Sequence, residues 1–112
     1  MISVLLERSK NGLLSSCKAE GHAGYATKGS DIVCSAVTVL LRTVLRILEN
    51  TDGIEIETDM HERGYLFFSI KVTQSNPELE LGLKYAGKFL ETGILSVVHE
   101  YPDFVELRYK TV

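Results

Sequence analysis

Two residues of this 112-residue sequence, His22 and Cys34, are of the types that acyl transfer requires. A cysteine thiolate attacks a carbonyl carbon, and a protonated histidine beside it gives its proton to the departing amine. Between them the segment from Gly21 to Ser30 carries three glycines in ten residues, which is typical of a loop. Such a loop can fold one residue onto the other, so the pair predicts a cysteine-dependent hydrolase.

The predicted elements around the pair strengthen this interpretation. His22 follows a predicted strand, and Cys34 falls in the first turn of a helix predicted to begin at Asp31. The positive end of a helix dipole and its free backbone N–H groups stabilise a thiolate, and the same N–H groups can hold a developing oxyanion. A second interpretation stays open, because free cysteines in apolar helices are commonly buried and inert.

Three neighbouring residues are candidates for supporting roles. Asp31 can orient His22 as a third catalytic group, or it can be a helix cap or a favourable charge in the first turn. Gly21 and Gly29 are expected to supply backbone freedom to a loop that closes over a peptide. A plain connection between two elements explains the same glycines.

The remaining cysteine and histidines are predicted to take no part in the reaction. Cys17 lies within a predicted strand and is expected to be a core residue. His61 and His99 are far apart in the sequence and have acidic neighbours, so solvated surface is favoured over a metal site. No Cys-x-x-Cys pair is present, and no metal or organic cofactor is expected.

Length and composition indicate one ordinary globular domain spanning residues 1–112, with 45% apolar and 24% charged residues. A formal net charge of −3 argues against nucleic acid as a direct ligand and suits a basic partner. The sequence has no apolar run of the roughly 18 residues needed to cross a bilayer. Residues 1–8 reach the charged Glu7 and Arg8 too soon for a signal peptide, so we expect a strand there instead. We therefore expect a cytoplasmic protein with free thiols and no membrane contact.

Periodicity predicts the order ββαββαβ, an α+β class with a mostly antiparallel sheet packed with two helices. The expected strands are 2–7, 13–20, 54–58, 65–72 and 104–109, and the expected helices are 31–50 and 77–98. Asn11-Gly12 predicts a hairpin turn, and Asn76-Pro77-Glu78 predicts a helix start. The first helix has an unusually wide apolar stripe, which indicates cover from the sheet and from a second subunit.

The stretch around the pair resembles the signature of the ribosomal-processing cysteine protease family, Prp. The matching residues are Gly21-His22-Ala23, followed by Gly29-Ser30-Asp31-Ile32-Val33-Cys34 and small or apolar residues. The resemblance implies a homodimeric protease that uses His22 and Cys34. It also implies a substrate, the precursor of a large-subunit ribosomal protein, from which the protease removes an N-terminal extension. The cut would have aromatic residues before it and a small residue after it.

One position departs from the family pattern, which usually has serine four residues after the cysteine. Here Thr38 keeps the hydroxyl and adds a methyl group, and we include it among the supporting residues. The alternative function is a non-enzymatic factor that binds a ribosomal protein or the ribosome and has an inert Cys34. A thioesterase or amidase acting on small molecules would share the reactive thiol.

Overall fold

The computed structural model describes the backbone of residues 1–21, 28–62 and 64–112, and the side chains of these residues except 28–31. The elements, in order, are β1 (Ile2–Arg8), β2 (Leu14–Glu20), α1 (Lys28–Glu49), β3 (Ile54–Asp59), β4 (Tyr65–Val72), α2 (Pro77–Glu100) and β5 (Val105–Thr111). The predicted α+β class and the order ββαββαβ are confirmed.

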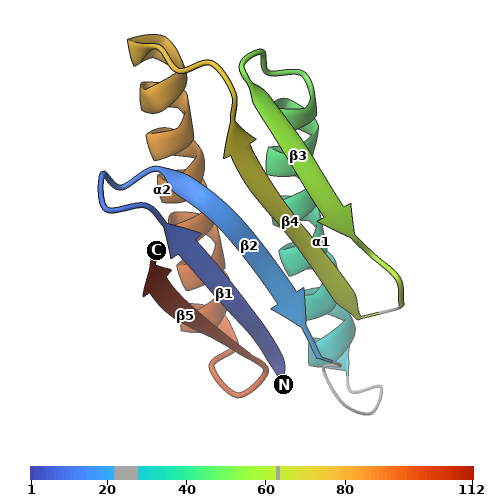
Figure 1. The fold of residues 1–112 in the computed structure, drawn as a ribbon. Helices are drawn as coiled ribbons and strands as arrows, with labels where there is room; N and C mark the ends of the chain where they lie inside the picture. Colours follow the sequence, from blue (N-terminus) through green and yellow to red (C-terminus); the bar gives the residue numbers. More distant parts are fainter. Residues whose placement is uncertain (22–27, 63) are drawn as a thin grey trace.

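The five strands form one sheet in the order β3-β4-β2-β1-β5. Every neighbouring pair is antiparallel except β1 and β5, which run parallel. Both helices lie on the same face of this sheet (Figure 1). The arrangement agrees with the mostly antiparallel sheet that the sequence predicts.

Alternation along the strands determines which face carries the core. In β1, Ile2, Val4 and Leu6 are buried, and the residues between them are only partly buried. Cys17 pairs with Leu6 on one side and with Phe68 on the other, so the apolar positions of three strands coincide on the helix-covered face. This follows from the two-residue period of a strand, which places alternate side chains on one face.

Helix α1 begins at Lys28, three residues before the predicted start at Asp31. Gly29 lowers helix propensity but does not forbid helical backbone, and the added turn contains no proline. Its sheet-facing side is buried at Val33, Val37, Leu41, Val44, Leu45 and Leu48. The outer part of the wide apolar stripe is exposed, with 54% of Ile32 and 62% of both Val39 and Ile47 open to solvent. The sheet alone therefore does not cover the whole stripe.

Helix α2 begins where the sequence predicts. Asn76 is the N-cap, and its side-chain oxygen accepts a hydrogen bond of 2.8 Å from the N–H of Leu79. Pro77 occupies the first turn, where its missing N–H costs nothing. Gly93 lets α2 approach α1 closely, since a Cβ there would lie 2.9 Å from Leu40 Cδ2.

Within the part of the chain that the structure describes, neither helix is long and apolar enough to span a bilayer.

Candidate active site

A cavity of about 790 Å³ opens at one end of the sheet, between α1 and the turn that joins β3 to β4. At this end β1 begins, β2 and β3 end, and β4 begins (Figure 1). Its described lining is Ile2, Ala19, Glu20, Gly21, Cys34, Val37, Thr38, Leu41, Arg42, Met60, His61, Glu62, Gly64, Tyr65 and Leu66. The buried residues of this lining are all aliphatic, and most of the exposed ones are polar.

Helix α1 supplies the cavity wall that contains the predicted nucleophile. Cys34, Thr38 and Arg42 recur every fourth residue and therefore share one face of the helix. Cys34 is half-buried and packs against the core, whereas Thr38 and Arg42 are exposed. The predicted nucleophile and the supporting hydroxyl thus line the same cavity, together with a cation that sequence reasoning did not single out.

The observed start of α1 corrects the predicted setting of Cys34. Because the helix begins at Lys28, Cys34 is in its second turn and not in its first. Only the first four N–H groups of a helix lack an intrahelical partner, so the Cys34 N–H belongs to the helical ladder. The dipole effect also falls off within the first turn. The predicted contribution of a free helix terminus to the thiolate and the oxyanion is therefore wrong.

Gly21 directly follows β2 and borders the cavity. Its φ of +115° is rarely adopted by residues with a side chain, and its N–H donates a 3.1 Å hydrogen bond to the carbonyl of Gly64. A Cβ at Gly21 would collide with the carbonyl oxygen of Met1. A glycine is therefore needed directly after β2, where the chain enters the Gly21-His22-Ala23 part of the family motif.

The other predicted site residues either have only their backbone described or lie outside the described part of the chain. His22 lies outside the described residues. Gly29 and Asp31 are in the backbone of the first turn of α1, and their side-chain environment lies outside the description. The structure brings Cys34, Thr38 and Gly21 to one cavity and leaves the roles of His22, Asp31 and Gly29 as predictions.

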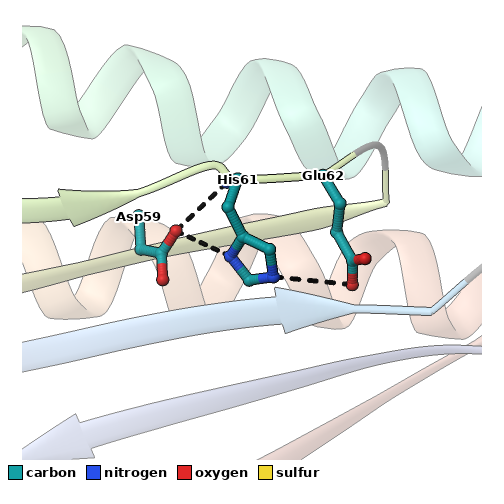
Figure 2. A network of polar contacts seen from close by, with 3 residues as sticks. All are labelled: Asp59, His61 and Glu62. Atoms are coloured by element: carbon teal, nitrogen blue, oxygen red, sulfur yellow. Dashed lines mark hydrogen bonds and ion pairs between the residues drawn. The ribbon is translucent and has the colours of Figure 1, made fainter.

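His61 is a cavity residue that sequence reasoning assigned to solvated surface. Its side chain is indeed 56% exposed, but its ring is held in place (Figure 2). Nδ1 lies 2.7 Å from Asp59 Oδ1, and the His61 backbone N–H donates to the same oxygen over 3.1 Å. Nε2 lies 3.7 Å from Glu62 Oε1, and the ring centroid is 4.7 Å from that of Tyr65.

These contacts change the acidity of the imidazole. The hydrogen bond to the Asp59 carboxylate raises the pKa of His61 above its usual 6.5, and the charges of Asp59 and Glu62 act in the same direction. One feature of the sequence could have predicted this contact. Asp59 and His61 are two residues apart before a hairpin turn, a spacing at which an aspartate accepts local hydrogen bonds.

The second thiol is chemically different from Cys34. Cys17 is fully buried, and burial raises the pKa of its thiol to about 12. A thiol with that pKa is almost entirely protonated near neutral pH, so Cys17 is a core residue, as predicted. Among the residues the structure describes, no three histidine, cysteine or acidic side chains are grouped to hold a metal ion.

Comparison with known proteins decides the family. The family described as "Cysteine protease Prp" matches residues 1–106. The chain belongs to the Prp family of cysteine proteases. A relative from Mycoplasma pneumoniae, named "Ribosomal processing cysteine protease Prp", is 33% identical over 87 residues, which are 78% of this chain and 79% of the relative.

Solved structures share the fold along nearly the whole chain. SMU.848 from Streptococcus mutans has a TM-score of 0.75 at 26% identity, covering 100% of this chain and 96% of that one. The essential ribosomal processing protease Prp from S. aureus, solved with a substrate peptide, has a TM-score of 0.78 at 17% identity, covering 98% and 100%. A second structure of that protease holds a covalently linked product peptide, with a TM-score of 0.73 at 24% identity and the same coverage.

Membership of the Prp family identifies the chain as a cysteine protease. Of its two thiols, Cys17 is buried and protonated, and Cys34 lines the cavity at the end of the sheet. The two positions explain which thiol is accessible to a peptide.

Proposed function

We propose that this chain is an endopeptidase that removes the N-terminal extension of a large-subunit ribosomal protein, with Cys34 as nucleophile and His22 as general acid and base. The observation that most supports this proposal is that Cys34 lines a cavity of about 790 Å³, which is large enough to bind peptide side chains. Support for the substrate class comes from the name of the Mycoplasma pneumoniae relative and from the peptide-bound S. aureus protease.

The reaction follows from the two residue types. The Cys34 thiolate attacks the scissile carbonyl carbon and forms a tetrahedral oxyanion. This intermediate collapses as the C–N bond breaks, and the protonated His22 gives its proton to the departing amine. Water, deprotonated by His22, then attacks the thioester, releases the acid product and regenerates the thiol.

The position of Cys34 makes the thiolate depend strongly on His22. Because Cys34 is in the second turn of α1, the helix terminus stabilises its thiolate little. Arg42 is a cation on the same helix face, but eight residues along the helix separate it from Cys34 by about 12 Å. The imidazolium of His22 is then the main stabilising charge, with Asp31 as its orienting group and Thr38 as a polar contact beside the thiolate.

The remaining features complete the proposal. Residues 1–112 act as one domain in the cytoplasm, without a metal or organic cofactor and without direct contact with nucleic acid or a membrane. Gly21 supplies the positive φ that the backbone needs directly after β2, and Gly29, in the first turn of α1, is kept as a supporting residue. A homodimer is supported by the uncovered apolar side chains of α1, Ile32, Val39 and Ile47. Light scattering of the purified chain at micromolar concentration should give twice the 12.5 kDa chain mass.

The test is cleavage of the host's ribosomal-protein precursor under reducing conditions. Native chain, Cys34→Ala and His22→Ala are compared with two matched controls, Cys17→Ala and His99→Ala. We expect a single cut that is lost in the first two variants and retained in the controls. Failure of the folded native chain to cut the true precursor would refute the proposal.

Thiol alkylation separates this function from a binding factor with an inert cysteine. In the proposed enzyme, iodoacetamide modifies Cys34 faster than a free cysteine near neutral pH, and more slowly once His22 is replaced. Equal rates in the native chain and in His22→Ala would favour the binding factor.

A further inference from the structure

The side chain of His61 is exposed, but its contacts hold it in one orientation. An exposed side chain gains little from packing, so fixing its rotamer is a net entropic cost. Yet the 2.7 Å hydrogen bond between its Nδ1 and Asp59 Oδ1 and the contact with the ring of Tyr65 hold the side chain on the β3–β4 turn. The backbone N–H of His61 donates to the same Asp59 oxygen over 3.1 Å. The arrangement is consistent with a side chain that is prepared for a ligand.

The contact with Asp59 also determines which nitrogen is available. An ionised carboxylate only accepts hydrogen bonds, so the proton of the imidazole must be on Nδ1. Nε2 is then the atom left for another partner. The Glu62 carboxylate is 3.7 Å away, which is too long for a hydrogen bond, and within the described residues no other group bonds to Nε2.

His61 lines the same cavity as Cys34, from a different wall. Cys34 comes from α1. His61 comes from the turn between β3 and β4 (Figure 2). The buried lining of this cavity is aliphatic and includes Val37, Leu41 and Leu66. A peptide whose scissile carbonyl reaches Cys34 would therefore extend past a prepared imidazole.

We propose that His61 is a substrate-binding residue, whose Nε2 hydrogen-bonds a backbone amide of the peptide held in the Cys34 cavity. The inference rests on the proposed protease function. A peptide amide suits Nε2 in either protonation state: neutral Nε2 accepts from the amide N–H, and protonated Nε2 donates to the amide carbonyl. The contact adds to ground-state and transition-state binding alike, so it changes KM and leaves kcat nearly unchanged.

The test measures kcat and KM for a peptide spanning the N-terminal extension of the precursor. His61→Ala should raise KM by about 3- to 10-fold, the effect of one hydrogen bond, with kcat within about twofold of the native value. His61→Gln should recover part of the loss, because its terminal amide can take the place of Nε2. The matched control is His99→Ala, an exposed histidine on α2 outside the described lining of the cavity, which should leave both constants unchanged.

Alkylation of Cys34 is measured on the same samples and should be equal in native chain and His61→Ala, which shows that the thiol is untouched. An unchanged KM in His61→Ala would overturn the inference while leaving the protease function intact. A fall in kcat and in alkylation rate at constant KM would overturn it by assigning His61 to proton transfer. Absence of cleavage by the native chain would refute the protease function itself, and the inference with it.

Discussion

Replacement of Gly21 by alanine tests whether the end of β2 is built as described. At φ +115° a side chain adds strain of about 1–3 kcal/mol. The new Cβ also collides with the Met1 carbonyl oxygen, so one of the two segments must move. Movement of Gly21 sacrifices its hydrogen bond to the Gly64 carbonyl, worth about 1 kcal/mol.

The sum is a loss of about 2–4 kcal/mol in the free energy of unfolding. At about 4 °C per kcal/mol for a domain of this size, Tm should fall by about 8–16 °C. Urea denaturation followed by circular dichroism measures the first quantity, and a thermal scan measures the second.

Gly12→Ala is the matched control for this experiment. Gly12 also has positive φ, +82°, but a Cβ there would meet nothing within 4 Å. Its replacement therefore reports backbone strain alone, about 1–2 kcal/mol. Equal losses for the two variants would refute the argument that contact with Met1 makes the end of β2 intolerant of a side chain.

Four further outcomes can be measured. Asn76→Ala should lower the free energy of unfolding by about 1 kcal/mol in urea denaturation, because it removes the N-cap of α2. Gly82→Ala should raise it by about 0.5–1 kcal/mol, since a Cβ at this helical position meets nothing. An NMR titration should place the pKa of His61 above 6.5, and Asp59→Asn should return it toward that value. Because folding raises this pKa, the pair stabilises the fold below about pH 6.5 and loses its effect as pH rises through the folded pKa. Cys17 should resist alkylation at pH 8 until urea exposes it.

Local signals predicted the elements well where one residue's own chemistry decides the conformation. Asn11-Gly12 predicted the first hairpin because glycine accepts positive φ, and Gly12 has φ +82°. Asn76 and Pro77 predicted the start of α2 for the same kind of reason, and Asn76 caps it. Such conformations depend on a few neighbouring residues, so a single sequence suffices to predict them.

The start of α1 was predicted less well because its signals conflict. Gly29 is a poor helix former and suggested a loop, and Asp31 resembled a first-turn charge. Helical backbone nevertheless extends back to Lys28. The error matters chemically, since it moves Cys34 from the first turn to the second.

The cavity beside Cys34 is a feature that periodicity does not predict. Cys34 was found through its motif, and Thr38 through its place in the family pattern. His61 was missed because its relation to Cys34 is tertiary: the cavity forms only where the ends of several strands meet α1. The sequence predicted a solvated His61, and its exposure is as expected, but its place in the cavity is visible only in three dimensions.

The parallel pairing of β1 with β5 has a consequence for how the chain folds. Ser3 and Glu106, which are 103 positions apart in the sequence, share a hydrogen bond, and the Ile2 N–H donates to the Phe104 carbonyl. Contacts of such long sequence separation form slowly, because closing a large loop costs entropy before the contact stabilises anything. During synthesis β1 must wait for β5, with an unpaired edge that can join another chain. Since Ile2 lines the same cavity as Cys34, this cavity is completed only when the pairing forms, so it is among the last parts of the structure that the nascent chain builds.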